Sequence, residues 1–460
     1  MSPSAPSTLW SATAGGDAPR YDDPVTGDAD VVIVGAGYTG LWTALSIVAA
    51  DPTVRVLVVD QSSVGFGASG RNGGWCSALL PISLAALAGR HGRDDAIAMQ
   101  RAMFDTVAEV GRFAADTGAS FHRGGTITLA HDAYQQHRVR ESQAELREFG
   151  FGADDGRLLD AEEASAQCRA TNILGGFFVP HCAVVHPLQL ARVVAAEASR
   201  HGARIAERTT VREVGSRRVV TDHGSVHADV VVLATEAYTS QLPGRRRDVL
   251  PLYSMMIGSE PLSEAQSAEI GLADRPTFTS ATNMIIYGQL TADGRIAFGG
   301  RGAPYHFGSR IDERLDTDAR VRERLVRTVR RLFPVLRDVE FPFHWGGPLG
   351  IPRDWHPHAA FDRATGLASA GGYAGDGVAT ANLAGRILAD LILGHDSDLT
   401  RLPIAGHRSR RWEPEPLRWL GARLGAEAAT RADTAETSTA PLARHRAAAW
   451  GKVFGTLTGH

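Results

Sequence analysis

Residues 31–60 have the sequence VVIVGAGYTGLWTALSIVAADPTVRVLVVD, and this stretch decides the fold. The β-branched run Val31–Val34 predicts a buried strand. It is followed at once by Gly35, Gly37 and Gly40, and then by an apolar stretch of helical composition. The expected local structure is a strand, a tight turn and a helix that begins at the glycines.

A second apolar run, Val54–Val59, ends in Asp60, 20 residues after Gly40. This spacing predicts a βαβ unit with parallel strands. In such a unit the backbone N–H groups of the turn and the helix N-terminus bind a pyrophosphate, and the acid that ends the second strand accepts a hydrogen bond from a ribose hydroxyl. The stretch therefore predicts a dinucleotide site, and the alternative is a tight turn in an ordinary α/β domain.

The composition is that of an ordinary globular chain of 460 residues, 43% hydrophobic and 22% charged, which excludes a disordered or fibrous protein. A formal net charge of −3 provides no field that favours nucleic acid or an anionic membrane, so neither partner is expected. Residues 31–50 are uncharged, but their glycines and acidic flanks favour a buried strand, turn and helix over a membrane span. The cysteines Cys76, Cys168 and Cys182 are odd in number and lack CxxC spacing, which is typical of free thiols in a reducing compartment, so we expect a cytoplasmic protein.

The rest of the chain alternates between helical and extended patterns. Helices are expected over 82–118, 132–150, 188–201 and 378–393, and an apolar strand at 230–234 returns the chain to the parallel sheet. From about 250 to 349 the pattern changes to strands with turn signals, interrupted by an Arg-rich helix over 316–333. The expected fold class is α/β, with a Rossmann-like domain interleaved with a second domain built on an antiparallel sheet.

A second glycine-rich stretch, GFGASGRNGG at residues 65–74, supplies backbone that can lie flush against a large flat ligand. Taken together, GAGYTG at 35–40, Asp60 and this stretch closely resemble the D-amino acid oxidase superfamily of FAD oxidoreductases. The branch that the chain resembles most is the gamma-glutamylputrescine oxidoreductase group. The resemblance extends over about residues 28–400, because Val211, the strand end at 233–235, WGG at 345–347 and GGYAGDG at 371–377 also match its flavin motifs.

The resemblance implies that FAD is the cofactor and that the first domain binds it. The residues implied to bind FAD are Gly35, Gly37, Tyr38, Thr39, Gly40, Asp60, Gln61, Gly67, Ala68, Ser69, Arg71, Asn72, Gly73, Gly74, Trp75, Val211, Ala234, Thr235, Gly346, Gly347, Gly372, Tyr373, Gly375, Asp376, Gly377 and Val378. Some relatives tether FAD through a histidine near the first glycine-rich loop or a C-terminal cysteine. This loop offers Arg71 and Asn72 instead, and no cysteine follows Cys182, so FAD is expected to bind non-covalently.

The expected domain ranges follow from the same resemblance. An N-terminal arm (1–28) precedes a discontinuous FAD-binding domain (29–82, 151–250 and 345–400). A helical cap (83–150) and a substrate domain (251–344) are inserted into it, and a C-terminal helical tail (401–460) follows.

Amino-acid oxidases of this family carry an arginine that holds the substrate carboxylate, in a stretch that resembles residues 345–350 of this chain, where no arginine stands. The resemblance therefore implies oxidation of the C–N bond of a primary or secondary amine, by hydride transfer to flavin and hydrolysis of the imine, with electrons passing to oxygen or to a carrier. No catalytic side chain is assigned, because the flavin itself carries this chemistry. The candidates for the substrate pocket are Trp75, Tyr253, Met255, Met256, Tyr287, Arg301 and Trp345, each of which has plain core packing as its alternative role.

Two other functions stay open. Gly375-Asp376-Gly377 before a helix also resembles the GD motif of flavoprotein monooxygenases, which use NAD(P)H, although no motif for the pyridine nucleotide is evident. A flavin-binding sensor or subunit without turnover is the second alternative. The histidines His181, His186, His344, His356 and His358 are considered as proton shuttles, but their spacing matches no metal-binding pattern and no metal is expected.

Overall fold

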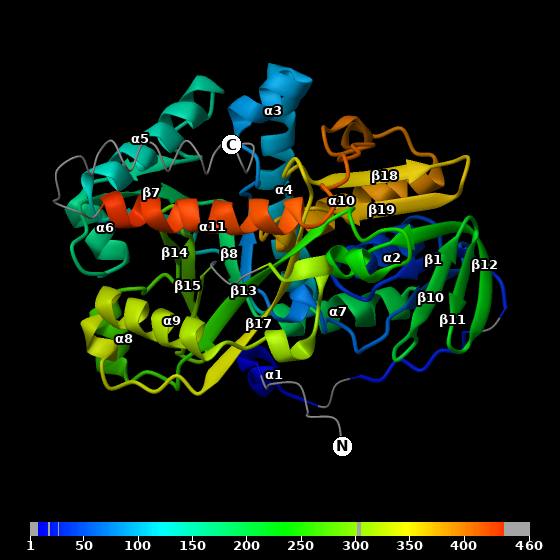
Figure 1. The fold of residues 1–460 in the computed structure, drawn as a ribbon, viewed down its shortest axis with the longest axis horizontal. Helices are drawn as coiled ribbons and strands as arrows, with labels where there is room; N and C mark the ends of the chain where they lie inside the picture. Colours follow the sequence, from blue (N-terminus) through cyan, green and yellow to red (C-terminus); the bar gives the residue numbers. More distant parts are fainter. Residues whose placement is uncertain (1–7, 17–18, 26, 301–304, 437–460) are drawn as a thin grey trace.

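The computed structural model describes residues 8–16, 19–25, 27–300 and 305–436, which form two eight-stranded sheets with helices packed around them (Figure 1). The candidate Arg301 and residues 437–460 of the expected tail lie outside the described residues. The expected α/β class is confirmed. No described helix combines the length and the apolar composition needed to span a bilayer.

The first sheet is built on β1 (Ala29–Val34), which pairs in parallel with β2 (Val56–Val59) and β12 (Gly224–Leu233). The strand order is β10-β11-β12-β1-β2-β9, and β19 pairs with both β12 and β18. The remaining strands of this sheet are β9 (Arg204–Ala206), β10 (Val211–Gly215), β11 (Arg218–Thr221), β18 (His358–Asp362) and β19 (Leu367–Gly371).

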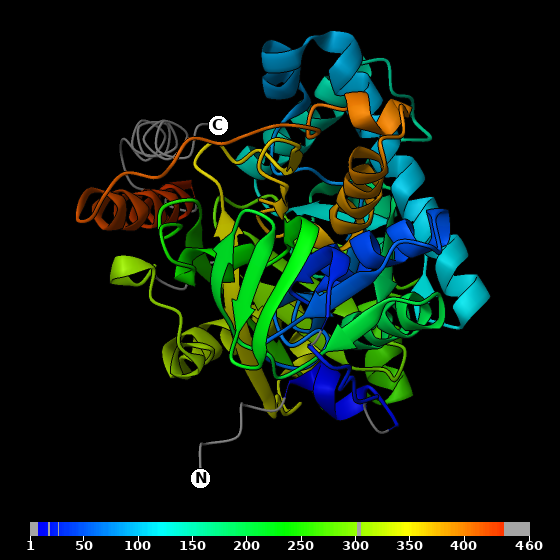
Figure 2. The ribbon, with the colours of Figure 1, turned by 90° about the vertical axis from the view of Figure 1, so that its right-hand side faces the viewer.

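Both faces of the first sheet are buried, which explains the continuous apolar runs in β1 and β2. Ile33 packs among residues of α2 (Tyr38–Ala50), α7 (Pro187–Arg200) and α10 (Gly377–Leu393). The next residue, Val34, packs on the opposite face against β10, β11 and β12. Figure 2 shows this arrangement, with the green strands β10–β12 on one side of the blue β1 and the helices on the other.

The second sheet has the order β17-β13-β16-β15-β14-β5-β7-β6. All its pairings are antiparallel except that of β14 with β5, so the sheet is mixed. Its strands are β5 (Thr126–Ala130), β6 (Arg157–Leu159), β7 (Gly175–Val179), β13 (Leu250–Gly258), β14 (Thr277–Ser280), β15 (Ile286–Leu290), β16 (Ile296–Gly300) and β17 (Phe343–Ile351). A small third sheet joins β3 (Trp75–Ser77), β8 (Cys182–Val185) and β4 (Phe121–His122).

The helices beside the second sheet include α9 (Ala319–Leu332), whose residues Val321, Leu325 and Val329 pack against the side chains of β13. The expected helical range 82–118 is divided into two helices at Gly92, whose φ of +100° is outside helical geometry. The remaining helices are α3 (Leu84–His91), α4 (Arg93–Thr117), α5 (Ala133–Glu148), α6 (Ala161–Gln167), α8 (Glu264–Ile270) and α11 (Leu417–Glu436).

The strand pairing differs from the expected division of the chain. The strands β5, β6 and β7 lie in the second sheet, although they come from ranges expected to form the helical cap and the FAD-binding domain. The strand β17 also lies there and runs across the expected boundary at residue 345. An alternating pattern identifies a short strand but not the sheet in which it pairs, because the pairing partners are distant in sequence.

The N-terminal arm is not simply extended, because it contains the helix α1 (Leu9–Thr13). Leu9 and Trp10 of this helix are buried, and the Trp10 indole N–H donates to the Asn72 carbonyl oxygen at 2.8 Å. The ring of Trp10 also packs edge-on against that of Trp345. The arm therefore packs against the glycine-rich loop. Figure 1 shows α1 below β13 and β17.

Candidate cofactor and substrate sites

Close backbone packing at the turn between β1 and α2 requires glycine at positions 35 and 40. Gly35 has φ +114°, and a Cβ on it would lie 2.5 Å from the Ala234 carbonyl oxygen. A Cβ on Gly40 would lie 1.9 Å from the Gly35 carbonyl oxygen. This close packing holds the N-terminus of α2 directly after the end of β1. The N-cap residue Gly37 and the first residues of α2 line the cavity described below, so the positive end of the helix dipole lies at its wall.

Asp60 directly follows β2 beside this turn and is half-buried. Its Oδ2 accepts from the Ala36 N–H at 2.7 Å and its Oδ1 from the Ser62 N–H at 2.8 Å. Burial raises the pKa of Asp60, and these two hydrogen bonds oppose the rise. An ionised carboxylate has about four acceptor positions, so Asp60 can accept from ribose hydroxyls while it holds the turn.

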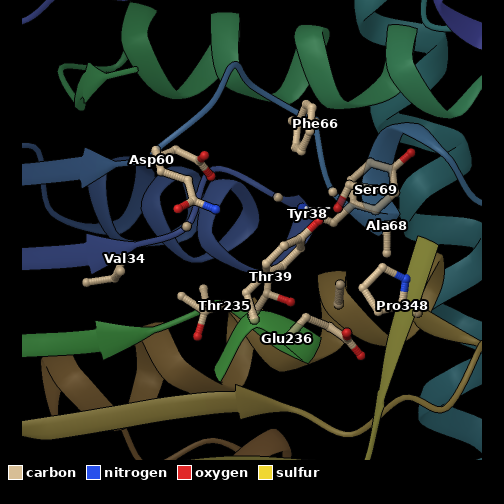
Figure 3. Close-up of a pocket in the computed structure, with 18 of the residues that line it drawn as sticks. Val34, Tyr38, Thr39, Asp60, Phe66, Ala68, Ser69, Thr235, Glu236 and Pro348 are labelled. Carbon is tan, nitrogen blue, oxygen red and sulfur yellow. Dashed lines mark hydrogen bonds between the residues drawn. The ribbon is translucent and has the colours of Figure 1, made fainter. Parts of the chain in front are cut away.

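A cavity of about 440 Å³ runs along the C-terminal ends of β1, β2 and β12. Figure 3 shows its side chains around one hollow, with Val34 and Asp60 toward one end and Ala68 and Pro348 toward the other. The expected cofactor residues that line it are Gly35, Gly37, Tyr38, Thr39, Asp60, Gln61, Gly67, Ala68, Ser69, Asn72, Val211, Ala234, Thr235, Tyr373, Gly375, Gly377 and Val378.

A second cavity, of about 430 Å³, adjoins the first. The two share the lining residues Ala68, Asn72, Pro348, Leu349, Gly375 and Val378. The cofactor residues Arg71, Gly73, Trp75, Gly347 and Asp376 line this second cavity only. A ligand in the first cavity can therefore present one end to a second ligand at the shared boundary.

Other expected cofactor residues serve the packing around the cavities. Gly74, Gly346 and Gly372 line neither cavity, and Gly40 also lies outside both. A Cβ on Gly74 would lie 2.6 Å from the Val185 carbonyl oxygen, and one on Gly346 would lie 2.6 Å from that of Ser254. These glycines let neighbouring backbones approach closely.

The substrate candidates on β13 lie on opposite faces of that strand. Met256 lines the second cavity, as do Trp75 and Tyr287, whereas Tyr253 and Met255 face the core under α9. The reason is the alternation of side chains along a strand, which places residue 256 opposite to residues 253 and 255. Trp345 is buried against Trp10, and its indole N–H donates to the Arg71 carbonyl oxygen at 2.9 Å, so it supports the loop instead of lining the cavity.

Arg71 joins the glycine-rich loop to the second sheet. Its guanidinium forms an ion pair with Asp316, donates to the Gly346 carbonyl oxygen at 3.3 Å and lies 4.5 Å from the centre of the Phe66 ring. The Arg71 and Asp316 side chains are 9% and 5% exposed, so the pair is shielded from water. Burial raises the pKa of Asp316, although Arg71 opposes the rise. The charge of Arg71 is therefore already engaged within the protein.

Glu236 is a cavity residue that the sequence analysis did not select. It directly follows Ala234 and Thr235 at the end of β12, with φ +46°, and its carboxyl group lies against the Gly350 N–H at 2.8 Å. Its position after a recognised strand end was the signal that could have identified it. Burial raises the pKa of Glu236 to about 7, although hydrogen bonds from the Gly350 and Ala237 N–H groups oppose the rise.

Glu236 should make the stability of the cofactor-free protein depend on pH. Its pKa is about 7 when folded against 4.5 when unfolded, so the folded state binds the extra proton between these values, and the free energy of unfolding falls as pH rises through that window. In the Glu236→Gln variant this slope should decrease by up to about 1.4 kcal/mol per pH unit. Urea unfolding of both proteins at several pH values measures the two slopes, and equal slopes would contradict the assignment.

Further residues that line the first cavity but were not selected are Val34, Val59, Phe66, Thr209, Thr210, Tyr238, Gln241, Leu242, Ile311, Pro348, Leu349 and Ala381. The five histidines considered as proton shuttles line neither cavity. The three cysteines are buried, unpaired and outside both cavity linings, with their thiol pKa values raised by burial.

The arrangement is that of a dinucleotide-binding enzyme with a second ligand cavity at one end of the cofactor cleft. The glycine cradle, the acid that follows β2 and the start of α2 at the cavity wall fit the adenosine and pyrophosphate parts of FAD. A family model described as FAD dependent oxidoreductase (DAO) matches residues 30–391, and the chain belongs to this family. It is therefore a flavoenzyme whose cofactor is FAD.

Relatives with assigned names support the assignment to this family. The gamma-glutamylputrescine oxidoreductase of Escherichia coli K12 is 29% identical over 423 residues, which cover 88% of this chain and 94% of that protein. A probable oxidoreductase OrdL of Haemophilus influenzae is 29% identical over 387 residues, with 81% and 84% covered. In fold, glycine oxidase from Geobacillus kaustophilus matches with a TM-score of 0.71 at 21% identity, covering 84% of this chain and 100% of that one.

Proposed function

We propose that this flavoenzyme oxidises the C–N bond of a primary or secondary amine. The observation that carries the proposal is the chemistry of the second cavity, which opens onto the cofactor cleft. Its walls are mostly apolar or aromatic, from Trp75, Leu80, Met256, Tyr287 and Trp355. Such surroundings disfavour the ammonium form of an amine, and the neutral amine is the form that can lose a hydride.

The charges around the second cavity favour an amine over an α-amino acid. Arg71 and Asp376 are the charged residues among its described lining, and the guanidinium of Arg71 is paired with Asp316. A substrate carboxylate would therefore meet no unengaged cation in the part of the lining that the structure describes. Burying such a carboxylate without a partner is costly, whereas an uncharged amine has no such requirement.

FAD, when bound non-covalently here, would supply the acceptor for the hydride from the carbon next to the amine nitrogen and would pass the electrons on to oxygen or to a carrier. The protein holds the amine at the shared boundary of the two cavities, so that its C–H bond approaches the acceptor. The hydroxyls of Tyr287 and Ser254, 2.9 Å apart on the cavity wall, provide polar partners for the amine nitrogen. The start of α10 at Gly377 adds the positive end of a helix dipole at this boundary, which favours developing negative charge.

One named relative bears on the substrate class. The E. coli relative is named for gamma-glutamylputrescine, which contains an amine, and this favours the amine assignment. The neighbours in fold are named for amino acids, namely glycine and L-proline, but at 21% and 20% identity they speak for the fold alone. The unpaired thiols support a reducing compartment, and we place the protein in the cytoplasm.

Turnover with matched substrate pairs tests the proposal. Each pair consists of an amine and the α-amino acid that differs from it only by the carboxylate, and turnover is followed both by oxygen consumption and by reduction of a dye. We expect the better amines to exceed their paired amino acids in kcat/KM by about 10-fold to 100-fold, because a carboxylate meets no unengaged cation among the described lining residues. A consistent preference for the amino acids would contradict the proposal.

A further inference from the structure

Three histidines that are distant in sequence meet outside the two cavities. His91 is the last residue of α3, and His356 lies between β17 and β18. His407 lies in the loop after the short 3-10 helix Asp398–Arg401. One ring nitrogen of each lies within 4.8 Å of the others. The ring centres of His356 and His407 are 3.9 Å apart, and those of His91 and His356 are 5.1 Å apart.

The hydrogen bonds of the cluster leave two buried imidazole nitrogens without a partner. His356 is fully buried, and its Nδ1 is 2.7 Å from the Pro357 carbonyl oxygen, so Nδ1 carries the proton and Nε2 has the free lone pair. That Nε2 atom is buried and has no hydrogen-bond partner, and the same holds for Nε2 of His91. Buried imidazole nitrogens without a hydrogen-bond partner are costly in a folded protein unless a ligand satisfies them.

A carboxylate orients the third histidine. His407 Nε2 lies 2.9 Å from Asp354 Oδ2, which leaves its Nδ1 available. Asp354 Oδ1 accepts from the Ser409 hydroxyl, and Arg90 lies 3.8 Å from Oδ2. Carbonyl and carboxylate groups behind the imidazoles are the usual supports of metal-binding histidines.

We propose that His91, His356 and His407 bind one divalent transition-metal ion of the zinc class. Three neutral imidazoles with a fourth position for water are a common donor set for Zn²⁺. Bonds of about 2.1 Å in a tetrahedral site require nitrogens about 3.4 Å apart, so ion binding would draw the rings together from separations of up to 4.8 Å.

The site would join three separate parts of the chain. It connects the helical cap through α3 with residues 352–357 and with the segment around His407. Trp355, next to His356, lines the second cavity. A bound ion would therefore fix the wall that carries Trp355, without contacting the lining of either cavity itself.

Zinc content provides the test. Full-length protein with bound FAD and no histidine tag is treated with a chelator, incubated with Zn²⁺, freed of excess ion and analysed by mass spectrometry of the metal. We expect one zinc per chain in the unsubstituted protein and at most about a tenth of that in His91→Gln and His356→Gln. The matched control is His137→Gln, whose side chain is 72% exposed on α5 and should leave the zinc content unchanged.

Thermal unfolding gives a second readout. Zn²⁺ should raise the Tm of the unsubstituted protein and of the His137→Gln control, but not that of the two cluster variants. Asp354→Asn, a change at a positioning residue, should weaken zinc binding by about 10-fold to 100-fold. If His356→Gln does not fold, the partly exposed His91→Gln decides the result. Equal zinc content in the unsubstituted and His91→Gln proteins, or no zinc in either, would overturn the proposal.

Discussion

Gly40→Ala is expected to weaken FAD binding by at least about 100-fold, equivalent to about 2.8 kcal/mol, and to yield protein that is purified almost colourless. The added Cβ would lie 1.9 Å from the Gly35 carbonyl oxygen, which is a backbone atom and not the end of a flexible side chain. The N-terminus of α2 would have to move away from the end of β1. The N–H groups of the turn would then no longer be placed to hold the pyrophosphate.

The matched control is Gly421→Ala in α11. A Cβ on Gly421 would meet no atom within 4 Å, so the same change should leave FAD binding intact and stabilise the helix by up to about 1 kcal/mol. The measurement is FAD affinity by titration of the cofactor-free proteins, followed through flavin fluorescence. Equal affinities for the two variants would show that the turn between β1 and α2 does not hold the cofactor.

Arg71→Met is expected to lower the free energy of unfolding by about 3–5 kcal/mol. The change leaves the Asp316 carboxylate 5% exposed and without its partner. It also removes the hydrogen bond to Gly346 and the contact with the Phe66 ring, which join the glycine-rich loop to the second sheet. Burial already raises the pKa of Asp316, so the loss should shrink as the pH falls and that carboxyl group takes up a proton.

The double variant Arg71→Met with Asp316→Leu separates two contributions to the lost stability. One is the loss of the ion pair itself, and the other is the cost of leaving one buried charge without its partner. Replacing both members with apolar side chains should restore most of the lost stability, because no buried charge is left unpaired. Guanidinium unfolding of both single variants and the double variant completes the cycle. If the losses of the single variants simply add, the two residues do not interact as the structure describes.

The first domain could be predicted from sequence because its signal is local. The strand, the three glycines, the helix and Asp60 lie within 30 consecutive residues, and each takes its expected place. The cavity along β1 follows from this local order, since parallel strands end at the same edge of a sheet. For the same reason most of the expected cofactor residues line that cavity.

The second domain was harder to predict because its contacts are long-range. Alternation along β13 shows that Met255 and Met256 face opposite ways, but only α9 on one side and the glycine-rich loop on the other determine which of them lines the cavity. The role of Trp345 depends on the arm, since Trp10 packs on it from more than 300 residues away. The histidine cluster joins residues 91, 356 and 407, which no spacing rule connects.

The most direct test of amine oxidation is the visible absorption spectrum of the protein with bound FAD, recorded without oxygen before and after addition of an amine. The account predicts that an amine without a carboxylate bleaches the flavin bands, and that NADPH does not. Bleaching by NADPH alone would contradict the account and favour a monooxygenase, and flavin bands that no amine or amino acid changes would contradict it in favour of a flavin-binding protein without turnover.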